Sequence, residues 1–179
     1  MTLGLAQLGH QYWHLTTKGF NPLLHNVRLG KGWTASIDHS AQQTPGMTTL
    51  YAYQNEQPEK EAVWEQVRIE IDPVLLPPRL NGFFAFLSAD DAQRAQAKWG
   101  LDNRYLVEVY AGPGAKVHLA DSELLVSKQE EWATNAGGYW RGDRTQTPLI
   151  EVLISGPIFF PKWELPPFGM LLPNGPVSE

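Results

Sequence analysis

The chain has 179 residues, of which 42% are hydrophobic and 18% charged, and its formal net charge is −5 at pH 7. This composition excludes an intrinsically disordered chain and argues against a general nucleic-acid binder, which needs concentrated cations. Because the sequence contains no cysteine, disulfides, thiol nucleophiles and cysteine-based zinc sites are also excluded.

We expect one α+β domain over residues 1–179, with a core at about 11–160 and a proline-rich C-terminal strap over 161–179. No apolar run approaches the ~20 residues of a transmembrane helix. The first residues lack a basic region followed by a long apolar run. The sequence therefore predicts no membrane contact, and a protein of the cytoplasm or one exported by a dedicated machinery.

In chain order, an aromatic and β-branched segment predicts a first strand over 11–17. Pro22 can open a short helix that extends to residue 26. Polar residues and a Pro-Gly pair predict a flexible loop over 38–48, and a short strand over 48–53 follows. Residues 57–71 favour a helix with an acidic start, although the alternation at their end is also compatible with a strand.

An apolar run predicts a buried strand over 82–87. Ser88 then caps a helix that extends to Trp99 and stops at Gly100. A clear strand follows over 104–111.

Residues 112–114 form a turn, and the return over 115–119 predicts a hairpin with the strand before it. Glycines over 135–143 predict a mobile loop. The last clear strand covers 148–154.

Glu151 stands in that last strand, where the residues on both alternating faces are apolar. An ionised carboxylate in such surroundings costs several kcal/mol unless it is paired or lines a cleft. Two interpretations stay open: a structural ion pair with an arginine, or a cleft carboxylate whose charge serves a function.

His14 lies in the first strand and shares a face with Tyr12 and Thr16. It is either a structural histidine or a hydrogen-bonding ligand contact. His10 and His14 have a metal-ligand spacing only on a helix, since four strand residues span roughly 13 Å. We therefore expect no metal site.

These segments, taken in order, resemble the ADP-ribosyltransferase-like fold. They are a first strand with His14 and Thr16, a strand over 82–88 that runs into a helix, and a late strand with Glu151. The histidine class of that fold is the nearer match. Residues 77–84 and 104–109 resemble more narrowly an uncharacterised family of bacterial and phage proteins. The resemblance implies two small, mostly antiparallel sheets around a cleft, with a few short helices.

The resemblance implies NAD as a substrate. Glu151 would hold the ribose 2′-hydroxyl and stabilise the positive charge that develops as nicotinamide leaves. His14 would bind the adenosine ribose, and Thr16 would support that ribose or the nicotinamide edge.

Phe84 would stack on nicotinamide, at a place where the family usually has a tyrosine. Phe83 and Phe86 are the other rings of that strand. Ser88 matches a family serine, although we also expect it to cap a helix. Arg79 follows two prolines and is the preferred contact for the pyrophosphate, ahead of Arg28 and Lys31.

The implied activity is transfer of ADP-ribose from NAD with release of nicotinamide, or NAD hydrolysis on the same fold. The acceptor, which could be a protein, a nucleic acid or a small molecule, and the oligomeric state are left open by the sequence. Leu149, two residues before Glu151, argues against an arginine-modifying enzyme. The alternatives are a catalytically inactive binding module on this fold, or an interaction protein of a phage or toxin system.

Overall fold

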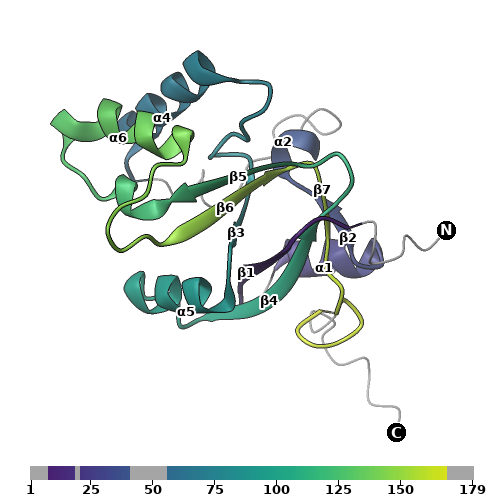
Figure 1. Ribbon diagram of the computed structural model, residues 1–179. Helices are drawn as coiled ribbons and strands as arrows, with labels where there is room; N and C mark the ends of the chain where they lie inside the picture. Colours follow the sequence, from purple (N-terminus) through teal and green to yellow (C-terminus); the bar gives the residue numbers. More distant parts are fainter. Residues whose placement is uncertain (1–7, 19–20, 41–55, 169–179) are drawn as a thin grey trace, which may run out of the picture.

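Figure 1 shows the computed structural model, which describes residues 8–18, 21–40 and 56–168. In this part of the chain seven strands form one antiparallel sheet, in the order β2-β7-β4-β1-β3-β6-β5. The strands are β1 (Gln11–Thr17), β2 (Trp33–Ala35), β3 (Phe83–Phe86), β4 (Arg104–Ala111), β5 (Lys116–Asp121), β6 (Ile150–Ser155) and β7 (Pro157–Phe159). The α+β class is confirmed, but the strands form one sheet where we expected two.

The helices of the described residues are short. They are α1 (Pro22–Leu29), α2 (Ile37–Ser40), α4 (Pro58–Ile71), α5 (Ala89–Lys98) and α6 (Trp132–Arg141), with 3-10 turns η2 (Ser122–Leu125) and η3 (Gln129–Glu131). The helical interpretation of residues 57–71 is thus confirmed, and the strand alternative is wrong. No helix in this part of the chain is long and apolar enough to cross a membrane.

The sheet is weakest between β1 and β3. These two strands are joined by a single residue pair, Trp13 with Phe86. By contrast, β1 pairs with β4 along its whole length, and β3 does the same with β6. The sheet therefore consists of two well-paired groups of strands, one on each side of this joint.

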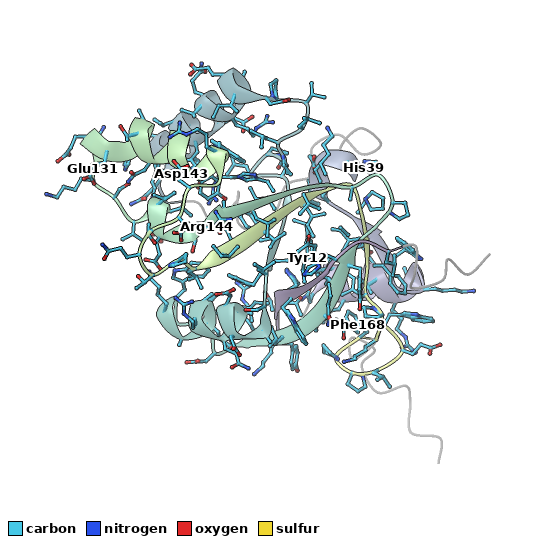
Figure 2. The ribbon with its side chains drawn as sticks, in the orientation of Figure 1. Tyr12, His39, Glu131, Asp143, Arg144 and Phe168 are labelled. Carbon is cyan, nitrogen blue, oxygen red and sulfur yellow. The ribbon has the colours of Figure 1, made fainter. Side chains whose placement is uncertain are left out.

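Helices cover both faces of the sheet (Figure 1). On one face, α4 and α6 lie side by side over β5 and β6, and α5 covers the other end. On the opposite face, α1 packs with the segment after β7 in the largest apolar cluster. Tyr12 and Phe168, both buried in that cluster, are labelled in Figure 2.

The predicted hairpin between residues 104–111 and 115–119 is wrong. β4 pairs with β1 and β7, whereas β5 pairs with β6. The reason is a bend at Gly156, whose φ of +124° separates β6 from β7. A Cβ at Gly156 would also lie 3.0 Å from the Cα of Ala115, so this bend requires glycine.

The mobile loop predicted over residues 135–143 is also wrong, because most of it belongs to α6. The helix buries Ala136, Tyr139 and Trp140 against α4 and the sheet. A Cβ at Gly138 would lie 3.1 Å from the carboxylate of Asp143, which follows the helix.

Other expectations have mixed outcomes. Within the predicted loop over 38–48, residues 38–40 belong to α2, and the rest lies outside the described residues. The predicted strand over 48–53 lies outside them too, as do residues 169–179 of the C-terminal strap.

Candidate functional site

Arg79 lies at the centre of a buried polar cluster under α4 and α6. It belongs to the segment before β3 and is 3% exposed. Its Nε lies 3.1 Å from Oε2 of Glu61 on α4. Its Nη1 donates to Oε1 of Glu151 on β6 and to the phenol oxygen of Tyr139 on α6, both at 2.6 Å. One guanidinium thus connects two helices to the sheet.

Two aromatic rings enclose the guanidinium of Arg79. Its Cζ lies 5.1 Å from the ring centroid of Tyr139 and 5.4 Å from that of Phe84. Rings at this distance attract a cation and exclude water from it. The ion pairs of Arg79 are therefore screened far less than surface pairs.

Glu151 uses one of its two carboxylate oxygens in this cluster. Oε1 accepts from Arg79 and from the hydroxyl of Tyr139. Within residues 8–18, 21–40 and 56–168, Oε2 has no hydrogen-bond partner. The residue as a whole is 4% exposed. Among the described residues, the carboxylate is thus held at one oxygen only.

Tyr139 stays protonated in this environment. Burial raises the pKa of its phenol well above the usual value, and the neighbouring Glu151 raises it further, while Arg79 lowers it. The neutral hydroxyl can therefore donate to Glu151.

His14 occupies the weak joint between β1 and β3. Its Nδ1 lies 2.6 Å from the main-chain oxygen of Phe84, and its ring lies 4.3 Å from that of Phe83. Burial lowers the pKa of His14 to about 4; the bond to Phe84 raises it and the charge of Arg104 lowers it. The ring is thus neutral at pH 7, with the proton on Nδ1 and an acceptor lone pair on Nε2.

His14 and Glu151 lie on opposite faces of the sheet. Trp13, Phe86 and Glu151 form one row across β1, β3 and β6. Successive strand residues point to opposite faces, so His14 points away from the face of Glu151. His14 and Glu151 stand on the two strands that flank β3. The structure does not bring their side chains together, because they point to opposite faces of the sheet.

Thr16 and Ser88 both serve helix ends. The hydroxyl oxygen of Thr16 accepts from Asn21 at 2.7 Å, and Asn21 caps α1. Ser88 Oγ accepts from the amide of Asp91 at 3.0 Å and donates to its carboxylate at 2.9 Å. The prediction that Ser88 caps a helix is confirmed, and its hydroxyl is occupied by that contact.

The three cations that we considered as pyrophosphate contacts do not form a phosphate site beside Glu151. Arg79 reaches Glu151, but its donors point at carboxylates. Arg28 and Lys31 are exposed residues at the end of α1, beside the opposite face of the sheet.

Three contributors to the site were missed in the sequence. Glu61 was assigned only to the acidic start of a helix, and Tyr139 fell in the predicted loop. The third is His118 on β5, whose Nε2 lies 3.0 Å from the main-chain oxygen of Tyr139. The signal for Tyr139 was the helical spacing of Trp132, Ala136, Tyr139 and Trp140.

The described residues thus form an α+β protein with one antiparallel sheet and a buried cluster of Arg79, Glu61, Glu151 and Tyr139. Residues 30–162 match the model of a family described as protein of unknown function, DUF2441, and the chain belongs to this family. The search of the curated proteins found no match.

Proposed function

We propose that this protein is an ADP-ribosyltransferase-like protein that takes NAD as substrate and releases nicotinamide. The observation that carries the proposal is the half-occupied carboxylate of Glu151. Arg79 and Tyr139 hold Oε1, and Oε2 has no partner within the described residues. Oε2 is thus suited to accept a hydrogen bond from a ribose hydroxyl.

A carboxylate is the group that this chemistry requires. When the bond between ribose and nicotinamide breaks, positive charge develops on the ribose, and a fixed carboxylate in low-dielectric surroundings stabilises it. The Phe84 ring, which we expected to stack on nicotinamide, lies beside Arg79.

The position of His14 does not give the proposal the support that we expected. It lies on the opposite face, but it stands at the joint where only Trp13 and Phe86 pair. Its neutral Nε2 is a second acceptor with no partner among the described residues.

The pyrophosphate of NAD needs a cation other than Arg79, which its carboxylates occupy. Arg104 on β4 is the candidate. Its Nε is buried and has no hydrogen-bond partner in the part of the chain that the structure describes, and its charge contributes to the lowered pKa of His14. Phosphate oxygens would supply acceptors for this guanidinium.

The second candidate function is a binding module on the same fold that takes NAD without chemistry. The burial of Glu151 favours it, because a carboxylate that is 4% exposed and paired with arginine also suits a purely structural role. The phenyl ring of Phe84 favours it too, since it cannot donate a hydrogen bond as a tyrosine does.

The test measures nicotinamide release and the melting temperature with and without NAD, for the wild type and for Glu151→Gln. The glutamine keeps an acceptor for Arg79 and Tyr139 and removes the charge. The transferase predicts release by the wild type and loss of at least tenfold in the variant. A ligand that binds the folded state raises the melting temperature.

Each outcome separates the candidates. A rise in melting temperature without nicotinamide release supports the binding module and rejects the enzyme. Neither a rise nor release rejects NAD as the ligand, and both candidates with it. Release that Glu151→Gln leaves unchanged rejects Glu151 as the catalytic residue.

A further inference from the structure

We propose that the end of α4 and the turn after it form a docking surface for a protein segment that carries apolar side chains between lysine or arginine residues. The surface, here called the α4 tip, consists of Ile69, Ile71, Val74 and Leu75. The proposal does not depend on NAD, and its test uses none.

The α4 tip collects apolar side chains that face solvent. Its four members are between 44% and 67% exposed. They are four of the nine large apolar side chains that are exposed in residues 8–18, 21–40 and 56–168. Figure 1 shows the end of α4 and the following turn at the upper edge of the molecule. A group of exposed apolar side chains marks an interaction site, whereas single scattered ones do not.

The turn that carries Val74 and Leu75 is held in one shape by Asp72. Its Oδ1 accepts hydrogen bonds from the amides of Val74 and Leu75, both at 2.9 Å. The amide of Leu76 donates to the main-chain oxygen of Asp72 at 3.1 Å. The two exposed side chains therefore stand on a fixed backbone.

Arg68 ties the same turn to the helix. It is buried, and its Nη1 donates to the main-chain oxygens of Pro73 at 3.2 Å and Leu76 at 2.8 Å. Its Nε and Nη2 donate to the two carboxylate oxygens of Glu65. A surface that is ordered before its partner arrives loses less conformational entropy on association.

The charges around the α4 tip are mainly negative. Residues 65–75 contain three carboxylates, those of Glu65, Glu70 and Asp72, and one cation, Arg68. Arg68 is buried and paired with Glu65 at 2.6 Å, so it offers no positive charge to a partner. Apolar side chains set among carboxylates complement a segment whose apolar residues alternate with lysine or arginine.

The same charges disfavour two other occupants. A second copy of this chain, bound about a two-fold axis, would bring the carboxylates of Glu70 and Asp72 toward those of the other copy. A membrane with anionic lipids would repel these carboxylates. A basic and apolar protein segment is therefore the occupant that we propose.

The experiment titrates the full 15N-labelled chain with a synthetic helical peptide of about 15 leucine and lysine residues, followed by NMR. A second peptide has glutamate in place of every lysine. We expect the lysine peptide to shift the amide signals of residues 69–75. At low salt it should bind at least about tenfold more tightly than the glutamate peptide, and added salt should reduce this difference.

Paired variants separate the α4 tip from exposed apolar residues in general. Val74→Ser combined with Leu75→Ser removes two apolar side chains and keeps the amides that donate to Asp72. We expect its affinity for the lysine peptide to fall about fivefold or more. The control is Leu29→Ser, which removes a similarly exposed leucine at the end of α1 and should change the affinity by less than about twofold.

Glu70→Gln tests the contribution of charge. The side-chain oxygen of Glu70 accepts from Gln66 at 2.8 Å, and glutamine keeps that acceptor while it removes the charge. The variant should weaken binding of the lysine peptide and leave the glutamate peptide no weaker. Melting temperatures check that each variant folds, and Leu75→Ser alone replaces the double variant if the latter does not fold.

The proposal is overturned if the lysine peptide does not bind, if both peptides bind alike, or if signals shift only outside residues 69–75. An affinity that the double variant leaves unchanged overturns it too. Self-association in sedimentation that the double variant abolishes would make a second copy the occupant. Binding to vesicles of phosphatidylserine and phosphatidylcholine that the double variant abolishes would make it a membrane, and either result overturns the proposal.

Discussion

His14 and Phe84 are joined across the weakest point of the sheet, where Nδ1 of His14 lies 2.6 Å from the main-chain oxygen of Phe84. Beyond the Trp13–Phe86 pair, β1 supplies no strand partner to this oxygen, so the imidazole takes that place. The ring of the same Phe84 lies beside Arg79 on the opposite face. One residue of β3 thus connects the histidine on one face with the charged cluster on the other.

The neutral His14 ring should make stability depend on pH. Its pKa in the folded protein is about 4, below the ordinary 6.5, so between these values the unfolded chain binds the proton more readily. The stability is fully present above pH 6.5 and is lost as the pH falls toward 4. The loss corresponds to roughly 2–3 kcal/mol.

Urea unfolding of the wild type and of His14→Asn from pH 7 to pH 4 measures this effect. The asparagine amide can still donate to Phe84 and does not titrate. Burial lowers the pKa of His118 too, which adds a loss of the same sign to both proteins and cancels in the difference. Parallel stability curves would contradict the role of His14.

Patterns of neighbouring residues in the sequence predicted much of this fold, and they singled out Glu151 in the site. The strand over β1, the strand over β4 and the Ser88 cap follow from residue spacing and side-chain chemistry within a few residues. Glu151 was conspicuous because an apolar strand on both faces offers no solvent to a carboxylate. Burial and an arginine pair were among the interpretations that this argument left open.

The rest depended on contacts that local pattern does not contain. The partner of β4 is decided by the bend at Gly156, more than 40 residues further along the chain. Tyr139 was missed because glycines in sequence favour a loop. In the structure those glycines lie inside α6, whose Ala136, Tyr139 and Trp140 are buried. Tertiary packing overrode propensity at the segment that supplies the phenol of the site.

The charged cluster should show strong coupling between its members. Arg79→Met leaves Glu61 and Glu151 buried without their cation, and we expect it to cost about 3–5 kcal/mol. Replacing both carboxylates by glutamine in the Arg79→Met background should recover more than half of that loss, since no buried charge then remains unpaired.

Denaturant unfolding of the single, double and triple variants measures this coupling. The comparison pair is Arg141 and Asp143, whose 3.2 Å ion pair is exposed. Removing either partner there should change stability by less than about 1 kcal/mol. Additive losses across Arg79, Glu61 and Glu151 would mean that the cluster does not behave as one electrostatic unit.

Ser88 offers a test that separates a structural hydroxyl from a ligand contact. Its Oγ accepts from the Asp91 amide at the first turn of α5, so Ser88→Ala should destabilise the protein by about 1 kcal/mol. Ser127 is the matched control, because its buried Oγ has no hydrogen-bond partner among the described residues and its removal should be neutral or slightly stabilising. Both variants should keep the wild-type increase in melting temperature on addition of NAD, since neither hydroxyl is used for the ligand. A smaller increase in Ser88→Ala alone would return Ser88 to the binding site, as the resemblance to ADP-ribosyltransferases implied.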